Sequence, residues 1–92
     1  MHFTLRYHPE VKEKDIPKLN VNIRKRIRTA IEQRLLVSPE MYSEPLRRTL
    51  KGYRKLRVGD DRIVLRIERQ NILILGICHR KDVYERMERR SQ

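Results

Sequence analysis

Basic side chains recur at spacings of two or four residues on both sides of a Gly-Asp dipeptide. Lys55 and Arg57 precede Gly59-Asp60, and Arg62 and Arg66 follow it. Alternate residues of a strand share one face, so a two-residue turn at either Gly59-Asp60 or Asp60-Asp61 puts these four cations on one face. The Gly59-Asp60 turn also places Arg57 directly opposite Arg62. Like charges that face each other destabilise a sheet, whereas a guanidinium group binds phosphate through two parallel hydrogen bonds. The spacing therefore predicts a phosphate-binding site. The alternative is ordinary surface charge, neutralised by nearby acidic residues.

A histidine is expected to extend this row of cations onto the next strand. A two-residue turn at Gln70-Asn71 would pair Arg62 with His79. Imidazole titrates near pH 6.5 and therefore suits general acid catalysis at neutral pH. The predicted row is Arg57, Arg62 and His79, with Lys55 one row away. The alternative for His79 is a strand-end residue satisfied by solvent. The same register would put Ile63, Leu65 and Ile67 on the core face, opposite Cys78, Gly76 and Ile74.

The first half of the chain predicts one strand and two helices. Apolar residues alternate through positions 2–7, which is typical of a half-buried strand. Pro9 suits the first position of a helix that ends near Pro17. Residues 20–37 show the spacing of an amphipathic helix, which Ser38-Pro39 closes. The apolar face of that helix consists of Ile23, Ile27, Ala30, Ile31 and Leu35.

The second half predicts a three-stranded meander followed by a helix. Residues 39–52 are expected to be irregular, with Leu46 and Leu50 as anchors, and the apolar period then changes to two. The fold class that follows is α+β, in the order β-α-α-β-β-β-α, with helices packed on a mainly antiparallel sheet. We expect one domain over residues 1–92. The three strands and the final helix are expected at Tyr53–Val58, Arg62–Glu68, Ile72–His79 and Arg80–Arg90.

The chain is strongly basic for its size. Its 92 residues include 23 Lys and Arg against 12 Asp and Glu, which gives a formal net charge of +11. Self-repulsion at this charge opposes compaction, so a polyanionic partner is expected: nucleic acid first, an acidic protein second and a membrane surface third. The alternative is a basic protein whose charge serves only solubility.

Several other classes of protein are disfavoured. The single cysteine, Cys78, ends an apolar run and is expected to be a small buried residue rather than a nucleophile. The longest apolar stretch, Ile72–Cys78, is too short to span a bilayer. No secretory leader opens the chain, so we expect a soluble, cytoplasmic protein. The three histidines lack the spacing of metal ligands, and no metal or other cofactor is expected.

Three segments resemble the RelE/ParE toxin superfamily. Residues 45–62 (PLRRTLKGYRKLRVGDDR) are similar to the central signature of RelE-type toxins, in which a P-L…L-K-G segment leads into a basic strand, a G-D turn and an arginine. Residues 76–84 (GICHRKDVY) resemble the G-x-x-H-R-x-D-x-Y ending of that family. Residues 15–19 (DIPKL), followed by an Arg-rich helix, are also similar to this group. Together the segments cover most of the chain in the family's order.

The resemblance implies a fold and an activity. The fold is a twisted sheet with two helices on one face and a short C-terminal helix. Toxins of the RelE branch cleave mRNA in the ribosomal A site without a metal: the ribose 2′-OH attacks the adjacent phosphate, and the 5′-oxygen leaves. The implied partners are the ribosome, mRNA and a RelB-like antitoxin with an acidic toxin-binding segment.

Five cationic residues match positions that the family uses for catalysis. Arg62 would stabilise the charged transition state. Lys55 and Arg57 would bind phosphate or help to activate the 2′-OH. Either His79 or Arg80 would protonate the leaving oxygen. Further cations that we expect to contact RNA are Lys51, Arg54, Arg66 and Lys81.

One aromatic match and two departures complete the comparison with the family pattern. Tyr84 matches a C-terminal tyrosine that would orient or stack on a base, with helix packing as the alternative. Asp61 stands where an aromatic residue commonly precedes the arginine, which adds a negative charge beside the site. Ser43 replaces a glycine in a loop. Two other functions stay open: a ParE-like, non-nuclease toxin that binds DNA gyrase, and a non-catalytic basic module that binds RNA or DNA.

Overall fold

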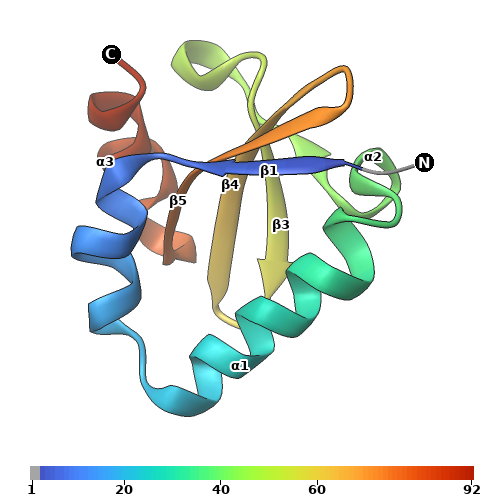
Figure 1. Cartoon of the computed structure of the whole chain (residues 1–92). Coiled ribbons are helices and arrows are strands. Elements are labelled where there is room, and N and C mark those ends of the chain that lie inside the picture. Colours follow the sequence, from blue (N-terminus) through green and yellow to red (C-terminus); the bar gives the residue numbers. More distant parts are fainter. Residues whose placement is uncertain (1–2) are drawn as a thin grey trace.

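Five strands form one sheet with helices packed against it (Figure 1). The computed structural model describes residues 3–92, so His2 of the first predicted strand lies outside the described residues. The strand order is β1-β5-β4-β3-β2; β1 pairs with β5 in parallel, and the other neighbours are antiparallel. This confirms the α+β class and adds the short β2, which was not predicted. The strands are β1 (Thr4–Tyr7), β2 (Glu44–Pro45), β3 (Arg54–Val58), β4 (Asp61–Glu68) and β5 (Asn71–His79).

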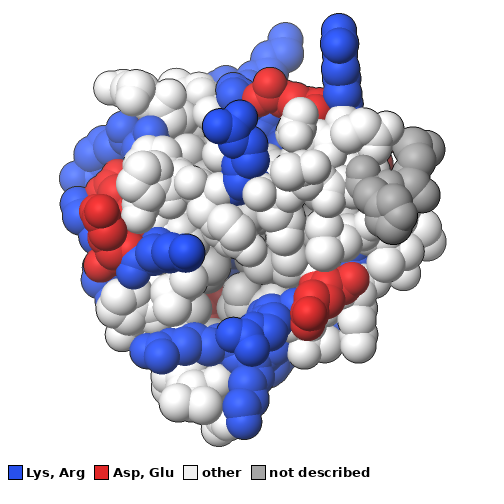
Figure 2. Space-filling model, viewed as in Figure 1, with Lys and Arg blue, Asp and Glu red and all other residues white. Residues whose placement is uncertain are grey.

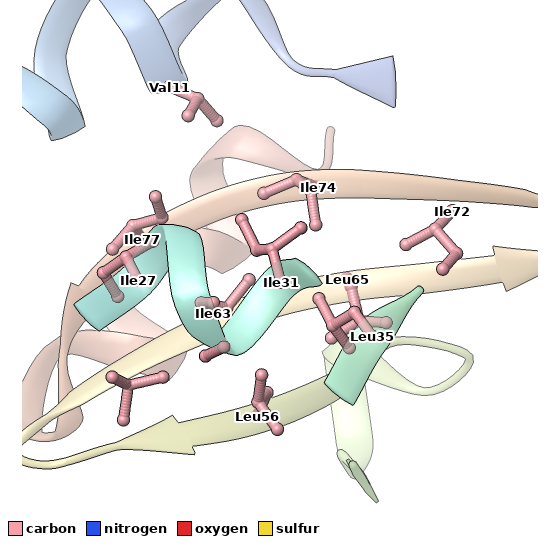
Figure 3. Packing of buried hydrophobic residues seen from close by; sticks show 12 residues of the cluster. Val11, Ile27, Ile31, Leu35, Leu56, Ile63, Leu65, Ile72, Ile74 and Ile77 are labelled. Atoms are coloured by element: carbon pink, nitrogen blue, oxygen red, sulfur yellow. The ribbon is translucent and has the colours of Figure 1, made fainter. Parts of the chain in front are cut away.

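A helical arm covers the first face of the sheet. It begins at Pro9, turns near Pro17 and ends just before Ser38, as predicted. Asn20 caps its longer half, because its Oδ1 accepts a hydrogen bond from the Ile23 N–H at 2.9 Å. The segments of the arm are η1 (Val11–Asp15), η2 (Ile16–Lys18), α1 (Val21–Ala30) and η3 (Ile31–Leu35). Figure 3 shows its apolar face against β3, β4 and β5; the buried residues of α1 and η3 are Ile27, Ala30, Ile31 and Leu35.

The opposite face of the sheet is covered by α3 (Val83–Arg90) and by the loop that precedes β3. Cys78 is one of the sheet residues beneath α3, and burial raises the pKa of its thiol to about 11, so the prediction of a buried apolar role is confirmed. The complete second cluster is Leu46, Leu50, Val64, Leu75, Cys78, Val83 and Met87. The remaining short elements are α2 (Pro39–Tyr42), η4 (Arg48–Leu50) and η5 (Arg80–Asp82).

The turn between β3 and β4 has the predicted register. Val58 pairs with Asp61 across Gly59-Asp60, and Arg57 therefore lies opposite Arg62. Gly59 has a φ of +61°, which a type II′ turn requires at its first central position and which glycine adopts without steric cost. The glycine thus fixes which side chains of the hairpin share a face.

The predicted register between β4 and β5 is wrong. The turn lies one residue earlier than expected, at residues 69–70, and a bulge in β5 shifts the pairing again. Arg62 consequently pairs with Cys78, while His79 pairs with Asp61. The physical reason is that β5 is apolar on both faces, so its side-chain pattern carries no information on register.

A buried carboxylate fastens α3 to the rest of the molecule. The Asp15 side chain is 0% exposed. Its Oδ2 accepts hydrogen bonds from the Ile77 N–H, at 2.9 Å, and from Arg90 Nη1. Its Oδ1 accepts from Arg86 Nη2 at 3.2 Å and from Arg90 Nη2 at 3.0 Å. One side chain therefore joins η1, β5 and α3.

Candidate active site

Three predicted site residues share one face of the β3–β4 hairpin. Arg57 lies opposite Arg62, and Lys55 lies opposite Val64 in the next row of that face. Val64 and Cys78, which flank these cations on β4 and β5, belong to the apolar cluster beneath α3. Arg57 is exposed, and Lys55 and Arg62 are half-buried. The cations thus form a group at the border of the surface that α3 covers.

Arg62 is fixed against its own turn. Its Nη1 donates to the backbone oxygens of Gly59, at 3.0 Å, and Asp61, at 2.9 Å. These bonds occupy one nitrogen and leave Nη2 and Nε to face an anion. The side-chain carboxylate of Asp61 forms no ion pair with Arg62 among the described residues. The guanidinium group is therefore oriented without being neutralised.

His79 ends β5 and caps the helical turn η5. Its Nδ1 accepts a hydrogen bond from the Lys81 N–H at 3.2 Å, so the neutral ring carries its proton on Nε2. Because His79 pairs with Asp61, the register places it outside the row of Arg57 and Arg62. Its predicted position in that row is wrong, while its chemical role is not tested by this geometry.

Arg80 lies beside the turn that precedes Arg62. The Arg80 N–H donates to the backbone oxygen of Asp60 at 2.9 Å. This hydrogen bond ties the start of the C-terminal helical segment to the β3–β4 turn. The Arg80 side chain is exposed and forms no ion pair within residues 3–92.

Tyr84, in the first turn of α3, contacts the residue that precedes η4. Its hydroxyl oxygen accepts a hydrogen bond from the Arg47 N–H at 2.9 Å, and the residue is 37% exposed. A second hydrogen bond joins α3 to η4 itself, because Thr49 Oγ1 donates to Glu88 Oε1. The ring is therefore fixed in place with part of its surface open to solvent.

Arg54, a predicted RNA contact, is engaged in holding a neighbouring loop. Its Nε donates to Ser43 Oγ at 2.7 Å, and its Nη2 donates to the Ser43 backbone oxygen at 2.7 Å and to the Glu40 oxygen at 3.0 Å. The departure from the family pattern at Ser43 thus supplies a buried hydroxyl that binds Arg54. A contact between Arg54 and RNA stays a prediction.

The other predicted RNA contacts differ in how free they are. Arg66 pairs with Glu68 at 2.7 Å, and its guanidinium lies 5.3 Å from the centre of the Tyr53 ring. Lys51 and Lys81 are exposed, and neither forms an ion pair within the described part of the chain. The two lysines are therefore free to meet an anion, whereas Arg66 already has one.

Two arginines of the helical arm also reach the β3–β4 hairpin, and sequence reasoning missed them. Arg34 Nη1 donates to the backbone oxygen of Arg57 at 3.4 Å. A β-carbon added at Gly59 would lie 3.1 Å from both Nη atoms of Arg26, so this guanidinium rests on the turn. Buried Ala30 lies between the two along the helix. The spacing of eight residues, with Ala30 midway, is a visible signal, but it does not reveal what that side of the helix faces.

The candidate site rests on cationic and aromatic side chains. Across residues 3–92, no three His, Cys, Asp or Glu side chains come together in a way that could hold a metal ion. The helices of the same range are all too short or too polar to cross a membrane.

Solved structures with the same fold come from several toxin–antitoxin systems. A chain of the RelBE2 toxin–antitoxin complex from Mycobacterium tuberculosis is 28% identical, with a TM-score of 0.79, covering 87% of this chain and 100% of that one. A mutant of the Escherichia coli toxin RelE in the free state is 19% identical, with a TM-score of 0.71, over 100% of both chains. A chain of the RelB–RelE complex from Methanococcus jannaschii is 22% identical, with a TM-score of 0.68, covering 88% of this chain and 96% of that one.

The family is shown by sequence as well as by fold. No curated protein matches the chain significantly. The profile described as ParE toxin of type II toxin–antitoxin system, parDE, however, matches residues 5–84, which is most of the chain. The chain therefore belongs to the ParE toxin family of type II toxin–antitoxin systems, within the RelE/ParE superfamily.

Proposed function

We propose that this chain, as a single toxin domain over residues 1–92, cleaves mRNA on the ribosome without a metal. The observation that carries the proposal is the pair Arg57 and Arg62, which lie opposite each other beside Lys55. None of the three forms an ion pair within the described residues. An RNA phosphate placed between them would relieve their repulsion and receive two guanidinium groups.

The reaction that this arrangement supports is internal transesterification. The ribose 2′-oxygen attacks the adjacent phosphorus, the P–O5′ bond breaks, and the products are a 2′,3′-cyclic phosphate and a 5′-hydroxyl. Negative charge grows on the phosphate oxygens as the new bond forms, and Arg62, held by its turn, faces that charge without reorganising. Lys55 and Arg57 bind the phosphate, and their positive charge favours transfer of the 2′-proton to water.

Arg80 is proposed to act on the leaving 5′-oxygen. The backbone bond from Arg80 to Asp60 brings this residue to the turn that carries Arg62. A guanidinium group holds its proton at neutral pH, so Arg80 would stabilise charge on the 5′-oxygen while water supplies the proton. His79 is the alternative acid, but its imidazolium form would lose the hydrogen bond that Nδ1 accepts from the Lys81 N–H.

Tyr84 is proposed to stack on a base next to the cleaved phosphate. Its hydroxyl is already engaged by the Arg47 N–H, which leaves the exposed part of the ring as the functional surface. Loss of the ring would therefore weaken substrate positioning more than it would affect the chemical step.

An antitoxin with an acidic segment is the proposed protein partner, because the relatives include toxin–antitoxin complexes. A groove of about 450 Å³ between η1 and α1 offers such a segment a place. Its floor is apolar and includes Leu5, Ile16 and Ile27. Three cations from both helices line the groove, namely Lys12, Arg24 and Arg28. Glu32 is the one carboxylate among the described lining residues. An amphipathic acidic helix matches both the floor and the rim.

The test is translation of a defined mRNA by purified ribosomes, with cuts mapped by primer extension. Wild type should cut within the A-site codon, and Arg62→Ala should reduce cleavage at least ~100-fold, which is typical for loss of one charge-stabilising donor. Arg89→Ala is the matched control, because Arg89 is exposed, is paired with Glu85 and is not among the predicted RNA contacts. Intact mRNA with folded wild-type toxin would overturn the nuclease.

The family match gives one second candidate, a non-nuclease toxin that binds DNA gyrase. It makes the opposite prediction about the cation row. Growth arrest that persists in an Arg62→Ala, His79→Ala double variant, together with inhibition of gyrase supercoiling by the purified protein, would favour this candidate over the nuclease.

A further inference from the structure

A second cationic site lies on the far side of α1 from the apolar groove. It is a cleft of about 580 Å³ between the helical arm and the end of β3. Four cations line it, namely Lys25, Arg26, Arg34 and Arg57, and no carboxylate is among the described lining residues. Figure 2 shows Lys and Arg side chains gathered along α1, at the lower edge of the molecule in that view.

The helix contributes two rows of side chains to this cleft. Lys25, Thr29 and Gln33 form one row at a spacing of four residues. Arg26 and Arg34 form the second row, with buried Ala30 as the floor between them. The first row therefore adds a hydroxyl and an amide to the cations, and both groups donate hydrogen bonds to phosphate oxygens in nucleic-acid complexes.

The hairpin closes the other side of the cleft. Strand β2 pairs only with Arg54 and Lys55, so the last part of β3 is an open edge. Arg34 partly satisfies that edge by donating to the Arg57 oxygen at 3.4 Å. Arg26 rests on Gly59, where any larger residue would meet its guanidinium group. The two arginines are thus positioned by contacts with the hairpin rather than by acidic partners.

Arg57 links this cleft to the cation row described above. It lies on the open edge of β3: its backbone oxygen meets Arg34 in the cleft, and its side chain shares the other face of the hairpin with Arg62. Lys25, Arg26 and Arg34 form no ion pairs within residues 3–92, so their mutual repulsion is not compensated there. A polyanion that extends from the row into the cleft would relieve it.

We propose that the cleft binds backbone phosphates of the RNA strand whose cleaved phosphate lies at Arg57 and Arg62. The inference rests on the proposed function and extends its substrate site by a second set of contacts. An acidic protein segment fits less well, because the cleft offers four cations and hydrogen-bond donors, while apolar anchors are concentrated in the groove on the other side of α1. Backbone contacts of this kind position a strand without reading its sequence.

The test measures equilibrium binding of a fluorescent single-stranded 2′-O-methyl RNA by fluorescence anisotropy across a series of salt concentrations. This RNA has no 2′-OH and cannot be cleaved. Lys25→Gln/Arg26→Gln removes two cleft charges and keeps good helix formers. Its affinity at about 0.1 M salt should fall roughly tenfold or more, and the slope of log affinity against log salt should become shallower by about 1.4, or ~0.7 per lost phosphate contact. Thr29→Glu, which places a carboxylate in the cleft, should weaken binding in the same direction.

The matched control is Arg6→Gln/Lys18→Gln, which removes the same charge from β1 and η2, outside the lining of the cleft. A selective loss in the Lys25/Arg26 variant supports the cleft. The proposal would be overturned by equal losses of affinity in both double variants or by no loss in either. Displacement of the RNA by oligo-glutamate at equal charge would also overturn it. The wild-type protein could bind RNA through the cleft and yet leave ribosomal mRNA intact. That result would contradict the nuclease proposal and support the cleft proposal, so failures of the two proposals are distinguishable.

Discussion

Asp15 shows how one residue determines the position of a whole helix. Burying a carboxylate is costly unless its oxygens are fully satisfied, and here four hydrogen bonds from Ile77, Arg86 and Arg90 offset that cost. Arg90 depends on it in turn, because the Arg90 side chain is only 5% exposed. In the sequence Asp15 is noticeable only as the first residue of the DIPKL segment, since its partners lie more than sixty residues away.

Replacement of Asp15 should destabilise the fold more than replacement of any exposed acid. Asp15→Asn keeps the shape but removes the charge that Arg86 and Arg90 share, so we expect the free energy of unfolding to fall by about 3 kcal/mol or more. Urea denaturation followed by circular dichroism measures this. Glu10→Gln is the control: Glu10 also contacts Arg90, at 3.4 Å, but it is more exposed, so its replacement should lower the free energy of unfolding far less. Equal losses would show that Asp15 is not the clamp.

At the scale of elements, the close approach of α3 to β5 depends on the absence of a side chain at Gly76. A β-carbon there would overlap Met87 and Arg90. Gly76 has no unusual φ, so the constraint is steric rather than conformational. Met87 is fully buried in the second cluster and has little room to move.

Gly76→Ala should therefore lower the free energy of unfolding by about 1–3 kcal/mol, the usual cost of overpacking. Met87→Ala alone should cost about 2–5 kcal/mol, because it leaves a cavity. In the double variant the new methyl group enters that cavity, so the combined loss should be smaller than the sum of the two. Denaturation of all four proteins completes the cycle. Strict additivity would mean that the two positions do not press on each other.

An element can be predicted from sequence when its local conformation or burial restricts which residues fit there. The β3–β4 register follows from Gly59, because the turn needs a positive φ at that position, and the apolar face of α1 follows from its spacing. The β4–β5 register does not follow, because the turn uses Arg69 at φ +56° in place of a glycine, and the bulge lies in a run that is buried on both faces. The site was accordingly predictable up to Arg62 and not beyond it. His79 changed rows with the bulge, and the approach of Arg26 and Arg34 is a tertiary contact.

At the scale of the whole molecule, positive charge is distributed unevenly. The ion pairs within the described residues involve positions 8–15, the far end of β4 and α3. The cations of α1 and those next to the β3–β4 turn (Lys55, Arg57 and Arg62) have none among the described residues, so unpaired positive charge lies where RNA is proposed to bind. A binding surface of this kind opposes folding when it is empty, because its charges repel one another.

The stability of the free protein should therefore rise with salt. Raising NaCl from roughly 0.01 to 1 M shortens the Debye length from about 30 to about 3 Å and screens the repulsion. The free energy of unfolding should increase on the order of 1 kcal/mol, comparable to two unit charges ~4 Å apart in water. Lys25→Gln/Arg26→Gln should be more stable than wild type at low salt and gain less from added salt, whereas Arg89→Gln, which removes a cation already paired with Glu85, should follow the wild-type curve. Urea denaturation at each salt concentration measures the difference. A wild-type stability that falls with salt would mean that the ion pairs outweigh the repulsion, and that the cationic surface places no strain on the empty fold.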